Sequence, residues 1–323
     1  MRTMYAVLCA IFLACAFPAC GAQQEQAAPV MRTRAEAIPA GAVKVSPSTD
    51  AHPPILHSEE FGQPAPLAGA VNTAGAEDSA FILPDGRTIY FFFTPDVGIP
   101  PEKQLLDGVT GIWVSRKGAG DWQQAERVVL QDKNQLAIDG AAFVQGDKMW
   151  FASARQGNLR GVDMWTATFR DGKWSGYTNA GEKLNLEYEI GEMHITADGK
   201  NMYFHSPRAG GQGGYDIWLT SLKDGRWQQP VNVAEVNSGE TEGWPFLTQD
   251  GNELWFTRTY MGTPAIYRAK KADGQWGQPE LIVSQFAGEP SLDNDGNLYF
   301  THHFFKDNNM IEADIYIAPR KTQ

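Results

Sequence analysis

Cysteine is almost absent from this chain of 323 residues. Cys9, Cys15 and Cys20 are the only three, and all of them lie in the first 20 residues. The remainder therefore has no thiol, which excludes disulfides, thiolate-bound metals and a cysteine nucleophile there. A sustained helical period is also absent, as are a serine nucleophile elbow, a phosphate-cradling loop and a paired-histidine zinc motif.

Positive charge is scarce as well. The 38 acidic residues outnumber the 27 lysines and arginines, which gives a net charge of −11 and a pI near 5.0. Such a chain repels the phosphates of nucleic acid, so we expect no nucleic-acid partner. It also repels anionic lipid, so we expect contact with a membrane only through a lipid anchor.

Residues 1–20 have the pattern of an export signal. Arg2 is followed by an apolar stretch at 5–17 that is too short to span a membrane. The sequence FPACG at 17–21 resembles a bacterial lipobox, which implies that Cys20 is lipidated. Two alternatives stay open: a second lipobox-like sequence, FLAC, ends at Cys15, and ordinary secretion would cleave the leader without lipidation. Several acyl chains would hold the protein firmly at a membrane.

The rest of the chain divides by composition. Residues 21–54 are rich in alanine, glutamine, proline and serine and have no hydrophobic period, so we expect a flexible tether. Residues 55–319 are long enough to bury most of their apolar surface as one domain, and residues 320–323 form a short tail. This division gives no indication of the oligomeric state.

A tight turn followed by an aromatic strand recurs through the domain. The copies are LPDGRTIYF at 83–91, VQGDKMWF at 144–151, TADGKNMYF at 196–204, TQDGNELWF at 248–256 and DNDGNLYF at 293–300. Asp-Gly accommodates the positive φ that a tight hairpin requires, and the aromatic runs after it are typical of strands. A third strand follows each copy, near Gly111, Asp163, Asp216, Ala265 and Asp314.

A period of roughly fifty residues with several short strands per unit is typical of propeller blades. Four units continue through a turn to a tryptophan, but the fifth stops at Pro319 without this part. The sequence EEFGQPAPLAGAV at 59–71 aligns with DGQWGQPELIV at 273–283, with Phe61 in place of the tryptophan. We therefore predict an all-β, five-bladed propeller of four-stranded antiparallel blades, closed by an N-terminal strand within 55–70 that removes an unpaired edge. The alternative is that this segment is a loose linker.

Several short motifs of the repeat resemble those of a known family. FASAR at 151–155, FHSPR at 204–208 and the DIW and DIY sequences resemble the WD40-like (PD40) repeats of TolB-type propellers. The loop RAGGQGGYDI at 208–217 is similar to that in propellers of envelope lipoproteins, which often carry a peptidoglycan-binding OmpA-like domain. The resemblance covers 55–319 and implies an exported protein of the periplasm or outer membrane whose propeller binds something. No OmpA-like domain follows here, so direct peptidoglycan anchoring is not implied.

Strand order in such blades sorts the loops onto two faces. The Asp-Gly turns share one face, where turn chemistry explains them and we assign no function. The opposite face, which we call the channel face, receives the loops that enter each inner strand and leave each second strand. Acidic, basic and aromatic side chains of these loops would surround a polar ligand at the axis. The predicted ligand-binding residues are Asp78, Asp139, Arg155, Glu192, His194, Arg208, Glu242, Trp244, Arg258, Glu289 and His302.

A structural role competes with this interpretation at every position. Loop carboxylates can cap backbone amides, and arginines of the Phe-x-Ser-x-Arg type can pair with a neighbouring acid. Glu192 and Arg208 are the first candidates for binding because they flank the longest glycine-rich loop. His302 and His303 are adjacent, but no third ligand at suitable spacing supports a metal site. We therefore predict neither a metal nor a cofactor.

Two classes of function remain. The first is a non-enzymatic binding or scaffold module of the bacterial envelope that recognises a protein or a glycan at the channel face. The second is a glycoside hydrolase, which needs two carboxyl groups about 5 to 10 Å apart across a sugar. Its candidates would be Asp78, Asp139, Glu192 and Glu289. Carboxylates that recur once per blade are typical of structural residues, so the sequence favours binding.

Overall fold

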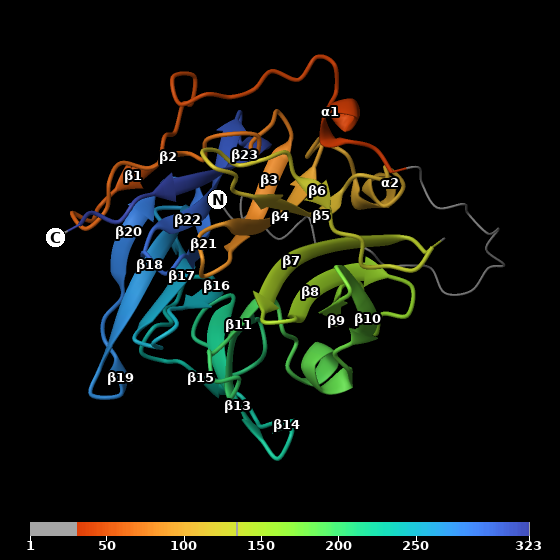
Figure 1. Cartoon of the computed structure of the whole chain (residues 1–323). Coiled ribbons are helices and arrows are strands. Elements are labelled where there is room, and N and C mark those ends of the chain that lie inside the picture. Colours follow the sequence, from red (N-terminus) through yellow and green to blue (C-terminus); the bar gives the residue numbers. More distant parts are fainter. Residues whose placement is uncertain (1–30, 134, 323) are drawn as a thin grey trace.

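Antiparallel strands make up almost all of the regular structure in the computed structural model, which describes residues 31–133 and 135–322 (Figure 1). Helices in this part of the chain are limited to α1 (Arg34–Ala37), α2 (Pro101–Gln104) and a π-helical turn at Lys183–Glu187. Across these ranges no helix has the length and apolarity needed to cross a bilayer. The all-β class is therefore confirmed. The leader, with Cys20, lies outside the described residues.

Antiparallel hairpins form at each copy of the repeated turn sequence. Gly86, Gly199 and Gly251 have φ values of 66°, 72° and 71°, which explains the Asp-Gly preference at these turns. The hairpins are β3 (Ala76–Ile82) with β4 (Thr88–Thr94), β7 (Ala137–Gln145) with β8 (Lys148–Arg155), β11 (Met193–Ile195) with β12 (Asn201–Ser206), β16 (Glu242–Leu247) with β17 (Glu253–Tyr260), and β21 (Ala287–Leu292) with β22 (Leu298–Lys306).

Third and outer strands extend each hairpin away from its inner strand. The third strands are β5 (Gly111–Arg116), β9 (Asp163–Arg170), β13 (Asp216–Lys223), β18 (Thr263–Ala272) and β23 (Asn309–Ala318). The outer strands on the first four of these are β6 (Glu126–Arg127), β10 (Lys173–Asn179), β15 (Val231–Asn232) and β20 (Glu280–Ser284). Two further short strands, β14 (Arg226–Trp227) and β19 (Gln275–Trp276), pair with the ends of β13 and β18.

Hydrogen bonds join the described strands into four sheets. The largest has eight strands because β23 and β3 meet in one parallel pair, Ala313 opposite Ala76, which links β21–β22–β23 to β3–β4–β5–β6. The other three sheets contain six, five and four strands. The sheets stand around a common centre, with the inner strands β3, β7, β11, β16 and β21 closest to it (Figure 1).

The segment that precedes β3 pairs with the last strand of the chain. β2 (Ala65–Pro66) lies antiparallel to β23, and Phe61 forms a bridge with Arg320. Trp276 pairs in the same way with Lys271 of β18. Phe61 therefore occupies the position in the last sheet that its alignment with Trp276 predicted. β1 (Ile55–Leu56) differs from the expectation, because it pairs with β20 of the neighbouring sheet. The N-terminal segment thus touches two adjacent sheets.

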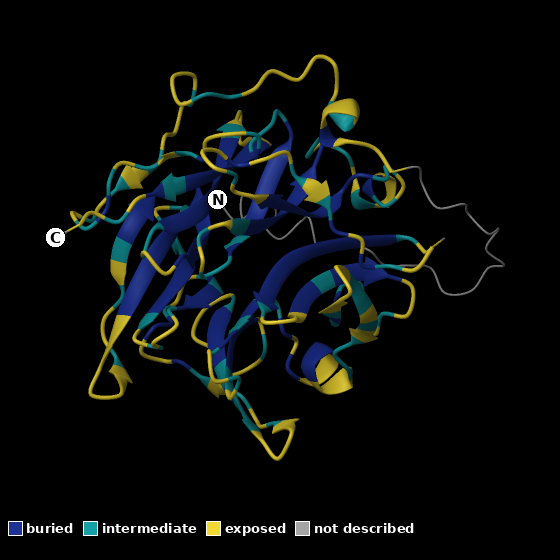
Figure 2. Cartoon of the chain, in the orientation of Figure 1, coloured by how far each residue is buried: buried dark blue, intermediate teal, exposed yellow. Residues whose placement is uncertain are grey.

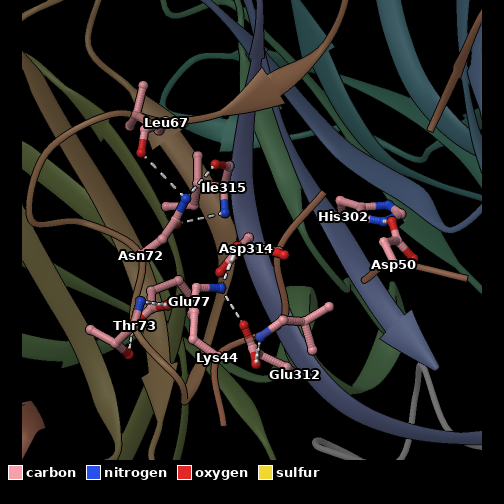
Figure 3. A network of polar contacts seen from close by, with 12 residues as sticks. Lys44, Asp50, Leu67, Asn72, Thr73, Glu77, His302, Glu312, Asp314 and Ile315 are labelled. Atoms are coloured by element: carbon pink, nitrogen blue, oxygen red, sulfur yellow. Dashed lines mark hydrogen bonds and ion pairs between the residues drawn. The ribbon is translucent and has the colours of Figure 1, made fainter. Parts of the chain in front are cut away.

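Residues 33–50, which fall in the part expected to be a flexible tether, lie against the sheets (Figure 1). We call this segment the N-terminal strap. Arg34 is buried and donates a hydrogen bond to Glu77 of β3. Lys44 binds two carboxylates of β23, and Asp50 contacts β22 (Figure 3). Composition could not reveal these contacts, because each depends on one polar side chain in an otherwise nondescript sequence.

Aromatic rings fill the centre where the inner strands converge. The ring centroid of Phe81 lies 5.3 Å from that of Phe143 and 6.4 Å from that of Phe246. His194 packs between Phe143 and Phe246, with centroid distances of 4.8 and 4.7 Å. Strand interiors are buried and the turns are exposed (Figure 2). The hydrophobic core therefore continues from between the sheets to the axis. The aromatic rings there lie between two cavities on the axis, which are described below.

Candidate functional site

A backbone bulge turns one side chain of most inner strands toward the axis. The pairing register shifts in β3, β7, β16 and β21, and left-handed φ values occur there at Ser79 (49°), Ala141 (53°), Trp244 (52°) and Glu289 (58°). Glu192 stands at the corresponding position before β11. Bulges commonly re-aim a side chain in this way, at some cost in backbone strain. These five residues line one cavity of about 40 Å³, which we call the axial cavity.

Three carboxylates at or beside the bulges differ from the residues at the corresponding positions of the other inner strands. Asp78 pairs with β4 just before the bulge, where the other inner strands have glycine, for example Gly140 in β7. Glu192 and Glu289 occupy the bulge position, at which the remaining strands have serine, alanine and tryptophan. Together with His303 of β22 they form what we call the axial cluster. Departure from the repeat distinguishes these residues from structural carboxylates.

Short contacts hold the axial cluster together. Nε2 of His303 lies 3.3 Å from Oδ1 of Asp78, and its Nδ1 is 3.3 Å from the carbonyl oxygen of Phe286. The amide of Ser79 donates to the carboxylates of Asp78 at 2.9 Å and of Glu289 at 2.6 Å. Asp78, Glu289 and His303 each offer one ligand atom within 4.8 Å of the others, and all three side chains are buried. The sequence argument against a metal considered only adjacent residues, whereas the fold brings Glu289 from the paired strand β21 and Asp78 from β3 to His303.

Burial and mutual repulsion separate the pKa values of the three carboxyl groups. Burial and the charge of Asp78 raise the pKa of Glu192 to about 8. The same causes, with the charge of Glu192, raise the pKa of Glu289 well above its ordinary value. Burial would also raise the pKa of Asp78, but the charge and hydrogen bond of His303 outweigh it and hold that pKa below its ordinary value. The surroundings therefore favour ionisation of Asp78 over that of Glu192 and Glu289.

Two of the predicted carboxylates lie in ion pairs within their own sheets. Asp139 accepts a hydrogen bond from Nη2 of Arg155 at 2.6 Å, and Glu242 accepts one from Nε of Arg258 at 2.7 Å. Both guanidinium groups also lie over aromatic rings of their sheets. Arg34 of the N-terminal strap likewise forms an ion pair with Glu77 of β3 and lies over aromatic rings. This is the structural pairing that the sequence left open as the alternative to ligand binding.

The other predicted residues are not part of the axial cluster, although His194 and Trp244 line the axial cavity beside Glu192. His302 places Nε2 2.8 Å from Oδ2 of Asp50, so it faces the N-terminal strap (Figure 3). Arg208 lies over the ring of Trp218, 4.9 Å from its centroid, and forms no ion pair with another described residue. His194 lies in the aromatic centre, where burial lowers its pKa to about 3 and keeps the ring neutral. The structure therefore divides the predicted ring of ligands into separate groups.

A larger cavity lies beyond the aromatic centre, on the face of the Asp-Gly turns. Its volume is about 910 Å³, and we call it the turn-face cavity. Phe81, Phe143, His194 and Phe246 line its inner part, and the turns of all five hairpins contribute to its wall. Its polar lining includes Gln145, Gln249, Asp250, Lys271, Asp295 and Arg320. Sequence reasoning assigned no function to this face, because turn chemistry accounts for Asp-Gly whether or not a cavity lies beside it.

Comparison with known proteins places the chain near several solved structures at low similarity. No family model matches it, and no curated protein does. An endo-arabinase from Bacteroides thetaiotaomicron is 18% identical, with a TM-score of 0.48 over 82% of this chain and 99% of that one. TolB from Acinetobacter baumannii is 14% identical, with a TM-score of 0.45 over 78% of this chain, which spans 56% of TolB. A protein of unknown function from Dyadobacter fermentans is 12% identical, with a TM-score of 0.49 over 82% of this chain and 100% of that one. Likeness at this level does not indicate what the chain binds or catalyses.

Proposed function

We propose that the protein is a non-enzymatic binding module, a TolB-like propeller that holds a segment of a partner protein or a glycan in the turn-face cavity. The size of this cavity carries the proposal. About 910 Å³ lies in the range typical of ligand sites, roughly 300 to 1,000 Å³. The axial cavity of about 40 Å³ has room for only a few water molecules and cannot hold a comparable ligand.

The architecture that we propose has five blades and is closed by β2. Each blade consists of the three strands of one repeat and an outer strand, and the fifth takes its outer strand from the N-terminal segment. The antiparallel pairing of β2 with β23 and the bridge between Phe61 and Arg320 support closure. The single parallel pair of Ala313 with Ala76 is then a contact between the fifth and first blades.

The lining of the turn-face cavity suits a peptide or glycan ligand that has polar groups and flat apolar surfaces. Phe81, Phe143 and Phe246 present aromatic surface on which a sugar ring or an apolar side chain can pack. Charges of both signs lie around them, for example those of Asp250 and Lys271. Hydrogen bonds to such charged groups are stronger than neutral ones and fix the orientation of a ligand.

The test is binding of the full-length chain to an array of envelope-protein peptides and to a glycan array. Asp250→Lys and Lys271→Glu reverse exposed charges at the turn-face cavity, and each should weaken binding of the captured ligand at least tenfold. Arg208→Ala changes the channel face and is the matched control, which should bind like the wild type. Loss of binding in Arg208→Ala with no effect of the two charge reversals would place the ligand on the channel face. Absence of binding on both arrays would also contradict the proposal.

We also propose that the protein is exported and held at a membrane of the bacterial envelope through Cys20. Support comes from the apolar leader and the lipobox-like FPACG sequence. Incorporation of labelled palmitate should occur in the wild type and in Cys15→Ala but not in Cys20→Ala. Label retained by Cys20→Ala would move the anchor elsewhere, and label absent from all three proteins would favour simple secretion.

A glycoside hydrolase remains a second candidate because of one observation. The pKa of Glu192 is raised to about 8 while that of Asp78 is held low, and such a separation is what an acid and a base in one site require. The small axial cavity opposes this function, because a sugar would not fit beside both groups. Hydrolysis of a glycan panel by the wild type, abolished in Glu192→Gln, would replace the binding proposal.

A further inference from the structure

The axial cluster is short of positive charge compared with other buried carboxylates of the inner strands. Asp139, for example, is paired with Arg155. Asp78, Glu192 and Glu289 share a single imidazole, and among the described residues no lysine or arginine forms an ion pair with any of them. Burying carboxyl groups without a cation is costly even when they hold protons in common. A bound cation would remove this cost.

The geometry of the cluster also matches a mixed nitrogen and oxygen ligand set. Nε2 of His303 and Oδ1 of Asp78 are 3.3 Å apart, and ligand atoms that bind one ion at about 2.1 Å lie roughly 3 to 4 Å from one another. Nδ1 of His303 is within hydrogen-bond distance of the carbonyl oxygen of Phe286. A donor bond of this kind orients most metal-binding histidines and leaves the other ring nitrogen for the metal. Here that nitrogen faces the carboxylates.

We propose that Asp78, Glu289 and His303 bind one divalent transition-metal ion, Zn²⁺ or Mn²⁺. An imidazole together with two carboxylates suits these ions, whereas Ca²⁺ and Mg²⁺ take oxygen ligands almost exclusively. The axial cavity, which Glu289 borders, provides room for water molecules that complete the coordination. Glu192 lines the same cavity and would accept hydrogen bonds from that water.

Such an ion would have a structural consequence at a defined place. Asp78 belongs to β3, while Glu289 and His303 belong to β21 and β22. The two parts of the sheet are joined by the parallel pair of Ala313 with Ala76 and by a backbone hydrogen bond from the amide of Asn294 to the carbonyl oxygen of Pro84. The metal would therefore join the first repeat to the last at the axis, in addition to these backbone bonds.

The test uses the full-length chain, freed of metal with EDTA and with its three cysteines alkylated so that the leader cannot bind metal. Calorimetric titration with ZnCl₂ and MnCl₂ should show one site per chain, and CaCl₂ should not compete. The Tm should rise with the free metal concentration [M], because binding to the folded state stabilises it by RT ln(1 + [M]/Kd). His303→Gln and Glu289→Gln should each weaken the metal affinity at least tenfold and abolish the rise in Tm. His57→Gln, an exposed histidine on the outer edge of another sheet, is the matched control and should bind like the wild type.

Metal-free melts show whether the variants are folded. Glu289→Gln removes a carboxyl group from an uncompensated cluster, so its metal-free Tm should equal or exceed that of the wild type; Asp78→Asn provides a further variant if His303→Gln fails to fold. Three results would overturn the proposal: no stoichiometric binding by the wild type, unchanged affinity in the folded ligand variants, or Ca²⁺ binding that does not depend on His303. Because these readouts do not involve the turn-face cavity, they are independent of the array experiment.

Discussion

Nη1 of Arg34 lies 2.8 Å from Oε1 of Glu77, and both side chains are buried. The guanidinium also lies over the rings of Phe91 and Trp113. On β8 and β17 the strand itself supplies the arginine that pairs with the neighbouring inner strand, but β4 contains none. The N-terminal strap therefore provides a side chain that this repeat lacks.

We predict that Arg34→Ala destabilises the protein by about 3 to 5 kcal/mol, because it leaves the carboxylate of Glu77 buried without a cation. Urea denaturation measures the change in the free energy of unfolding. Arg32→Ala, an exposed neighbour, is the control and should have little effect. Adding Glu77→Gln to Arg34→Ala should recover part of the loss. If Arg34→Ala were as stable as the control Arg32→Ala, the strap would not contribute to stability.

Phe61→Ala tests the contribution of the N-terminal segment to the last sheet. Phe61 is completely buried, its ring meets that of Trp255 edge-on, and Arg320 covers its other side. Removal of a buried phenylalanine side chain costs about 3 to 5 kcal/mol, so thermal unfolding should occur at a clearly lower temperature. Val43→Ala, in an exposed part of the strap, should leave the Tm unchanged. A Phe61→Ala protein as stable as the wild type would contradict the closure by this segment.

Gly191→Ala tests the packing around the buried imidazole of His205. A Cβ atom at position 191 would lie 2.1 Å from Nε2 of His205, and the other side of the ring faces Gly243. Because the ring cannot move away from both, we expect a loss of about 1 to 3 kcal/mol in the free energy of unfolding. Gly41→Ala, where no atom lies within 4 Å of the new Cβ, is the control. Combination with His205→Ala should cost less than the sum of the two single changes, and strict additivity would refute this explanation.

Glu60→Gln should reveal a pH-dependent contribution to stability. Hydrogen bonds from Arg268 and the nearby charge of Arg320 lower the pKa of Glu60 to about 2. Since the folded-state pKa is below that of the unfolded chain, the ionised carboxylate stabilises the fold above about pH 4.5, and this stabilisation is lost as the pH falls toward 2. The wild type should therefore be more stable than Glu60→Gln at neutral pH, and the difference should shrink on acidification. Glu59→Gln, an exposed neighbour, should show no such trend.

Local patterns in the sequence were sufficient to predict the strands and their turns. Asp-Gly at Gly86 and Gly199 required a positive φ, and the aromatic runs that follow are the buried second strands. The alignment of Phe61 with Trp276 located the segment that pairs with β23. These features depend on residues that are close in the sequence, or on a repeat that shows which positions correspond.

The axial cluster could not be assembled from the sequence alone. Asp139 and Glu242 were grouped with Asp78 because all three enter inner strands, yet they occupy a different position and face arginines. The bulge decides which side chain reaches the axis, and its register depends on pairing across strands. His303 joins Asp78 only in the folded protein. One feature of the sequence could have singled out Asp78: it replaces the glycine that the other repeats have at this position.

The pairing of β2 and the N-terminal strap with β23 determines the order in which the molecule can mature. The earliest-synthesised part of the described chain has to wait for a strand that the ribosome adds some 250 residues later, with the intervening sheets assembled meanwhile. A polypeptide interrupted before β23 would leave Lys44 without its two carboxylate partners and Phe61 without its bridge to Arg320. Completion of synthesis thus becomes a checkpoint, because only a finished polypeptide can make both sets of contacts.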